Sequence, residues 1–209
     1  MRLVIGLLFV ITFFMATPTA YAADDAETRA TIETKMPEIV AKFGVSTEEA
    51  TAYLETVIKA AIAKQVAEQD GSEVSALYAD MLKQYSQVQL LGASVLAKGQ
   101  KLYNEKIKGS TPGTDVPPEL VMEIRAWASS AGQVLMLGST ASKTAFDYAQ
   151  QSFLQDEKCR IHTDTFRIGD CLDRLDKSLN LMQTVMKHLD LMTEAISVLQ
   201  LAVVARMTF

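Results

Sequence analysis

The sequence predicts an all-α fold, an elongated antiparallel bundle of three long helices with two shorter N-terminal helices packed on it as a cap. Along most of the chain, apolar residues recur at steps of three and four, which is the period of amphipathic helices. The five prolines lie mostly at expected helix ends, and no stretch alternates like a strand between turn residues. Long helices joined by short connections pack most simply as antiparallel neighbours.

Residues 1–22 have the three parts of a secretory signal peptide. Arg2 gives a positive start, the apolar stretch 3–15 follows, and the chain then reaches a small-x-small cleavage pattern that ends at Ala22. We therefore expect cleavage after Ala22 and a periplasmic or secreted protein. An uncleaved membrane anchor is the alternative, but an anchor needs about 20 apolar residues and this stretch is shorter.

Residues 23–71 are expected to form the helical hairpin that serves as the cap. Apolar residues mark one face of its first helix, at about 26–43. Pro37 lies inside this helix and predicts a break or a kink, because proline removes a backbone hydrogen bond and clashes with the preceding turn. Gly44 suits the left-handed position that follows a helix end.

The second helix of the hairpin begins at a capping-box pattern. Ser46 is followed three residues later by Glu49, so each side chain can bind the backbone N–H of the other residue. Apolar residues on one face extend this helix to about Gln69, and Gly71 closes it. The hairpin therefore has a defined turn and two amphipathic helices.

The long-helix bundle is expected over 72–209. Ser72 can cap its first helix at about 73–108, which would be about 50 Å long at the rise of an α-helix. Gly92 and Gly99 lie seven residues apart in this helix, among other small residues. Small residues at this spacing either let a neighbouring helix approach closely or weaken the helix into a bend.

Two further long helices follow the loop GSTPGTDVPP at 109–118. The first runs to about Glu157, and its apolar and small residues follow a heptad spacing that is typical of helix seams. The second runs from near Asp170 to about Met207. Its expected inner face contains Leu172, Leu175, Leu179, Met182, Met186, Leu189, Ile196 and Val203, with Thr193 and Gln200 as polar members.

Both cysteines of the chain, Cys159 and Cys171, flank the expected turn between the last two helices. Export places them in an oxidising compartment, where cysteines at such a turn tend to pair. We therefore predict a disulfide that clips the turn 159–171. A short closed loop of this kind contributes about 3 kcal/mol in the chain-entropy description.

The clipped turn would present an exposed tip that can bind a partner. The candidate residues of this interaction tip are Arg160, His162, Asp164, Phe166 and Arg167. The alternative is a zinc site at Cys159, His162 and Cys171, completed by Asp164 or Asp170. The ligand types suit zinc, but the spacing is not that of a paired zinc motif.

We expect no cofactor and no bound metal. A haem held by Met36 and His188 is the alternative, because Met and His serve together as axial ligands. The sequence has no Cys-x-x-Cys-His motif for covalent haem, and Met is also a common filler of helical cores. It also lacks the motifs of nucleophilic, metalloprotease and phosphate-binding sites, so we do not expect an enzyme.

The charge balance limits the classes of partner that we expect. The chain carries 20 Lys and Arg against 25 Asp and Glu, without basic clusters, so neither nucleic acid nor anionic lipid is an expected ligand. Long exported helices without a catalytic motif favour a structural or interaction component of a bacterial envelope or secretion assembly. The alternative is a membrane-active toxin, in which the runs 128–145 and 198–205 would enter the bilayer.

Overall fold

The structure is a computed structural model that describes residues 25–109, 117–154 and 165–207. Every element in these ranges is helical, which confirms the all-α class. The elements are α2 (Asp25–Phe43), α3 (Thr47–Asp70), α4 (Glu73–Leu102), the π-helical turn η2 (Tyr103–Ile107), α5 (Pro118–Leu154) and α6 (Thr165–Met207).

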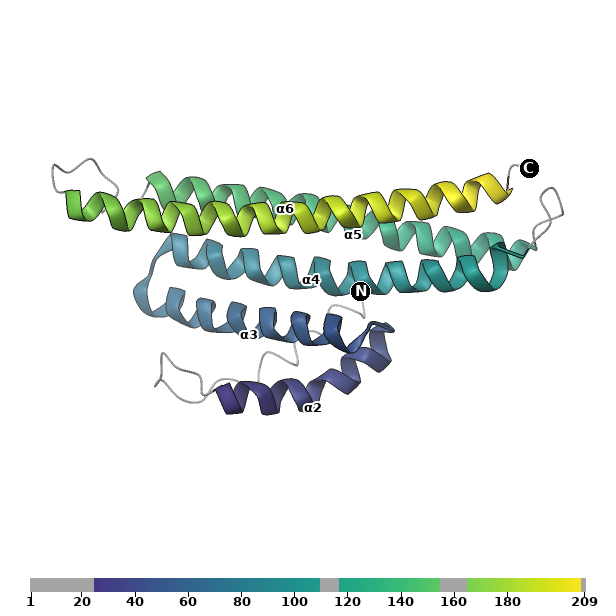
Figure 1. Cartoon of the computed structure of the whole chain (residues 1–209), viewed down its shortest axis with the longest axis horizontal. Helices are drawn as coiled ribbons and strands as arrows, with labels where there is room; N and C mark the ends of the chain where they lie inside the picture. Colours follow the sequence, from purple (N-terminus) through teal and green to yellow (C-terminus); the bar gives the residue numbers. More distant parts are fainter. Residues whose placement is uncertain (1–24, 110–116, 155–164, 208–209) are drawn as a thin grey trace.

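The three long helices α4, α5 and α6 form the expected antiparallel bundle (Figure 1). The arrangement of the N-terminal helices differs from the predicted cap. Figure 1 shows α3 lying lengthwise against α4, with α2 outside α3, so the hairpin adds layers along the side of the bundle. The extensive contact between α3 and α4 makes α4 the central helix of the fold.

The position of α4 depends on two apolar seams on the same helix. On one side, Leu90 and Ala93 join the core of the N-terminal hairpin, which includes Tyr53 and Leu54 of α3. On the other side, residues of α4 pack with α5 and α6 in two adjoining clusters, and their buried members are Val88, Val95, Trp127, Ala131, Val134, Ala141, Val185, Leu189 and Ile196. A helix with two covered seams must lie inside the structure.

The predicted helix ends of the hairpin are confirmed. Ser46 N donates to Glu49 Oε2 at 2.7 Å and Glu49 N donates to Ser46 Oγ at 3.2 Å, which completes the capping box. Gly44 and Gly71 have φ angles of 66° and 64°, in the left-handed region that glycine adopts without strain. Ser72 caps α4 by accepting from the backbone N–H of Ser75.

Pro37 does not break α2, which continues to Phe43. Figure 1 shows that the helix changes direction along its length and turns toward α3, as a proline kink would produce. The end of α2 is held by α4: the buried Ser94 Oγ donates to the carbonyl oxygen of Phe43 at 2.7 Å. This bond satisfies one of the carbonyl groups that a helix end leaves without a partner.

The third helix is not α-helical to Lys108 as predicted. Its last turn widens into η2, where Lys108 N donates to the carbonyl oxygen of Tyr103 at 2.8 Å. Ile107 is buried in this wider turn, while Lys106 Nζ contacts the carboxylate of Glu123 on α5 at 2.6 Å. The ion pair therefore joins this turn to α5.

The heptad seam of α5 is confirmed, but that of α6 is only partly so. The buried members on α6 are spaced by four and three, and the residues that pack inward are Val185, Leu189, Met192, Ile196, Leu199 and Val203. Met186 was expected on this face and instead remains 41% exposed. The helix begins at Thr165, earlier than the expected Asp170, and α5 ends at Leu154.

Gly92 and Gly99 allow α6 to approach α4 closely, as their spacing predicted. A Cβ atom at Gly92 would overlap the sulfur of Met192, and one at Gly99 would overlap a methyl group of Leu199. The Gly99 position also lies beneath Trp127, whose Nε1 atom would be 2.7 Å from the added Cβ. The first of the two expectations, close helix approach, is therefore correct.

This packing predicts a graded alanine series. We expect Gly99→Ala to lower the free energy of unfolding by about 2 kcal/mol, because the indole ring cannot yield without losing its own packing. Gly92→Ala should cost about 1 kcal/mol, since the flexible end of Met192 can move aside. Gly132 has open space around it, so Gly132→Ala should stabilise α5 by about 0.5 kcal/mol.

Urea titration followed by circular dichroism gives the three values under the same conditions. The order of stability should be Gly132→Ala, then Gly92→Ala, then Gly99→Ala. Equal stability of the Gly99 and Gly132 variants would contradict the close contact between α4 and α6.

Candidate interaction surface

Most of the interaction tip predicted from the sequence lies outside the described residues. This holds for Arg160, His162 and Asp164 of the tip, and also for Cys159. Two further tip residues, Phe166 and Arg167, lie in the first turns of α6, and Cys171 lies in the same helix. The disulfide and the tip therefore stay predictions. The same holds for the signal peptide, because residues 1–24 also lie outside the described part.

The described part of the structure contains a different candidate surface, on the outer side of α6. Large apolar side chains are exposed there: Leu191 is 55%, Val198 61%, Leu201 69% and Val204 54% accessible. Between Leu191 and Val204, Glu194 is the only charged residue of the sequence. Contiguous exposed apolar residues of this kind usually mark a binding surface.

The exposed residues follow a second heptad series along α6. Leu191, Ala195, Val198 and Leu201 are exposed and are separated by steps of four, three and three, and we call these four residues the outer stripe. The outer stripe is shifted from the inner seam, since Leu191 follows Leu189 by two residues. Heptad spacing is the pattern by which one helix packs against another helix.

Unlike the seams of α4, the outer stripe is not covered by another helix within the described part of the chain. Both seams of α4 are covered, one by the N-terminal hairpin and the other by α5 and α6. Helix α6 also has two seams, but only its inner one is covered within the described part of the chain. The exposed apolar residues of α5, which include Met122 and Met136, are too far apart to form a continuous stripe.

The proposed haem ligands do not come together. Met36 packs in the hairpin core, where its sulfur accepts from Thr51 Oγ1 at 3.6 Å. His188 lies on α6, with its ring 5.8 Å from that of Tyr85 and its Nδ1 atom 2.8 Å from the carbonyl oxygen of Thr184. Figure 1 shows that α3 and α4 separate α2 from α6, so this pair of residues cannot hold one iron atom.

Within the described ranges, no group of three or more His, Cys, Asp or Glu side chains is placed to hold a metal ion. None of the described helices combines the length and the hydropathy needed to cross a membrane. A comparison of the chain with protein-family models, curated proteins and solved structures finds no match. The outer stripe therefore has to be interpreted from its own geometry.

The sequence contains a signal for the outer stripe, although it predicts a different use. The apolar end at 198–205 is a membrane candidate when it is read as a short run. A search for two heptad series displaced by two residues would have found both seams of α6. Only the packing of Val185 and Leu189 shows which series faces inward.

Proposed function

We propose that the protein is an exported, non-enzymatic helical component that binds other proteins, as part of a bacterial envelope or secretion assembly. The observation that carries this proposal is the outer stripe of α6, an apolar heptad series that is exposed in the described structure. The signal-peptide pattern at 1–22 supports export, and the acidic chain favours protein over nucleic acid as the partner.

The spacing of the outer stripe indicates what the partner contributes. Leu191, Val198 and Leu201 offer apolar side chains about one and two turns apart, which suits the side chains of another amphipathic helix. The predicted disulfide-clipped tip near Cys159 and Cys171 would give a second contact at the end of α6. The two surfaces together would allow the long helices to join partners along and beyond the bundle.

Crosslinking in living cells followed by affinity purification tests this function. The variant Val198→Glu/Leu201→Glu places two carboxylates on the outer stripe, and it should remove the partners that co-purify with the unchanged chain. A matched control, Ser129→Glu/Gln133→Glu, adds the same charge to exposed positions on the outside of α5 and should retain them. Both variants should keep the circular dichroism spectrum of the unchanged protein.

Three experimental results would contradict this proposal. If nothing crosslinks to the unchanged chain, the interaction role is wrong. Binding to liposomes that depends on Val198 and Leu201, in the absence of partner proteins, would favour the membrane-active alternative. A Soret band in the absorbance spectrum of the purified protein would favour a haem protein, with ligands other than the pair Met36 and His188.

A further inference from the structure

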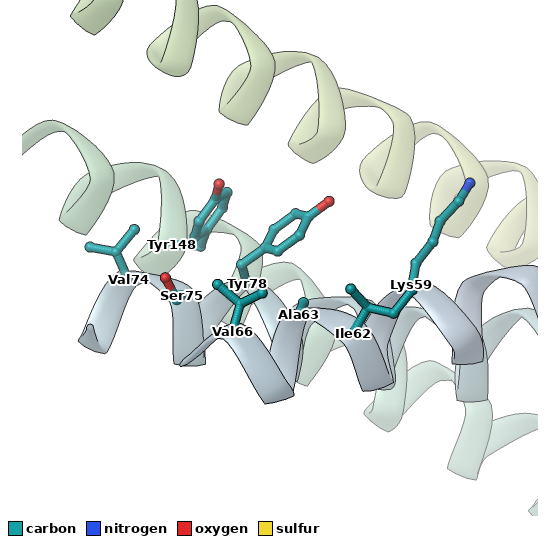
Figure 2. Close-up of a pocket in the computed structure, with 8 residues that line it drawn as sticks. All are labelled: Lys59, Ile62, Ala63, Val66, Val74, Ser75, Tyr78 and Tyr148. Carbon is teal, nitrogen blue, oxygen red and sulfur yellow. The ribbon is translucent and has the colours of Figure 1, made fainter. Parts of the chain in front are cut away.

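An open pocket without lining residues from α6 lies where the second half of α3 meets the start of α4 and the end of α5 (Figure 2). Its volume is about 380 Å³, within the range of small-molecule sites. Its lining residues are Lys59, Ile62, Ala63, Val66, Val74, Ser75, Tyr78 and Tyr148. The pocket therefore draws on three helices and on none of the residues of the outer stripe.

The pocket lies beside the part of α3 whose side chains are less buried. The buried residues of α3 all occur between Ala50 and Ala60, where they meet Leu90 and Ala93 of α4. Beyond Ala60, toward the turn at Gly71, the apolar side chains of α3 are only partly covered: Val66 is half-buried and Ile62 is 45% exposed. Unburied apolar surface beside a hollow is the usual starting point of a ligand site.

The floor of the pocket is apolar and elongated. Ile62 and Val66 lie one turn apart on α3, and Val74 faces the same space from the first turn of α4. These three side chains form a surface that an unbranched aliphatic chain can follow. Covering such surface stabilises a complex by about 0.8 kcal/mol for each buried CH₂ group.

Three polar donors of the pocket have no partner within the described part of the chain. Within the described part of the chain, the Lys59 ammonium group makes no ion pair, and the hydroxyl groups of Tyr78 and Tyr148 make no hydrogen bond. Figure 2 shows the hydroxyl group of Tyr78 pointing to the side on which Lys59 lies. The two phenol rings are 5.3 Å apart and tilted by 39°, so they form one wall of the pocket.

These donors have the sign and the arrangement that an anion requires. A lysine ammonium group and a neutral phenol hydroxyl both donate to carboxylate or phosphate oxygens. Burial raises the pKa of Tyr78, and the neighbouring Tyr148 raises it further, so this hydroxyl keeps its proton at neutral pH. Ser75 is the remaining polar residue, and its hydroxyl group already donates to Asp70 at 2.8 Å.

We propose that this pocket binds a single-chain anionic amphiphile. Its carboxylate or phosphate head contacts Lys59 and Tyr78, and its aliphatic chain lies on Ile62, Val66 and Val74. The proposal is independent of the protein-binding role of the outer stripe, because the two surfaces share no residue and lie on different helices. An exported protein with such a site meets ligands of this class as fatty acids or as single-chain phospholipid fragments.

Isothermal titration calorimetry with the full chain tests the proposal, with laurate below its micelle concentration as the first probe. The unchanged protein should bind laurate, and Lys59→Gln should weaken binding by about tenfold, the value of one hydrogen bond to a charged group. The matched control is Lys64→Gln, also on α3, which removes an exposed ammonium group outside the pocket and should leave the affinity unchanged.

Two further probes separate the head from the chain. Dodecyl phosphate tests whether a phosphate head binds more tightly than a carboxylate, and a preference for either head is consistent with the site. Dodecanol and dodecyltrimethylammonium carry the same chain without the negative charge, and both should bind more weakly than laurate. A spin-labelled fatty acid should broaden the methyl signals of Ile62 and Val66 and leave those of Val198 unchanged.

Three results would overturn the inference. They are an absence of laurate binding to the unchanged chain, equal affinities of the Lys59→Gln and Lys64→Gln variants, and equal binding of the cationic amphiphile. The substitutions are at exposed positions, and a circular dichroism spectrum identifies any variant that fails to fold. Failure here would leave the crosslinking result for the outer stripe unaffected, because none of the residues changed in that experiment lines the pocket.

Discussion

Replacing Trp127 with alanine is expected to lower the free energy of unfolding by about 4 kcal/mol, the typical cost of truncating a buried tryptophan. The side chain is only 6% exposed and lies between α4, α5 and α6. Its indole Nε1 donates to the carbonyl oxygen of Val95 at 2.9 Å, and the ring rests on Gly99. Removal therefore opens a cavity where the three helices meet, and also removes a hydrogen bond between α4 and α5.

Urea unfolding measured by circular dichroism checks this value. Trp127→Phe keeps most of the ring volume but not the N–H donor, so it should lose much less stability than Trp127→Ala. Met122→Ala is the matched control on the same helix, because Met122 is 70% exposed, and its effect should lie within about 0.5 kcal/mol of zero. A loss below about 1 kcal/mol for Trp127→Ala would show that the three helices do not meet at this ring.

Replacing Ile196 with alanine is expected to cost about 3 kcal/mol. Ile196 is fully buried on the inner seam of α6, in the same cluster as Val95, Trp127 and Val134. Few neighbouring side chains can fill the space, because the backbones are held at a fixed distance by the glycines of α4. The lost burial of apolar surface and the cavity that remains therefore both lower the free energy of unfolding of this variant.

Leu201→Ala provides the comparison within the same helix. Leu201 is 69% exposed, so truncating it should change the free energy of unfolding by less than about 0.5 kcal/mol. The same variant should reduce partner recovery in the crosslinking experiment, whereas Ile196→Ala acts through stability. Thermal unfolding of both variants decides the question, and a larger loss for Leu201→Ala than for Ile196→Ala would mean that the two faces of α6 are assigned the wrong way round.

Local sequence signals predicted the helix ends and the seam of α5. The capping box of Ser46 and Glu49 and the two left-handed glycines depend on a few neighbouring residues. The seam through Trp127, Ala131 and Val134 was also predictable, because its steps of four and three continue along the helix through apolar and small residues. Such features require no knowledge of which helices become neighbours.

The lateral packing of α3 and the register of α6 were not predictable in this way. The buried residues of α4 include small ones such as Ala79, Ser86 and Ala93, which do not stand out as an apolar face. In α6 an exposed face has the apolar signal of a buried one, because Leu191 and Val198 are as apolar as the buried Ile196. Periodicity alone cannot decide between two seams on one helix, and the contacts of α4 and α5 settle the choice.

The candidate pocket could not be inferred from the chain at all. Lys59, Tyr78 and Tyr148 come from three helices, and no spacing in the sequence connects them. Their proximity results from the way α3, α4 and α5 pack together. In contrast, the outer stripe is present in the sequence as a heptad series, and only its exposure had to come from the structure.

The paired glycines of α4 also determine how α4 and α6 are aligned lengthwise. Met192 and Leu199 are seven residues apart, as are the glycines that receive them. Sliding α6 by one heptad would bring Met192 to Gly99 but would leave Leu199 opposite Lys106, where there is no hollow to enter. The alignment is therefore fixed within the helices, and the segments that join them can gain or lose residues without moving the outer stripe relative to α4.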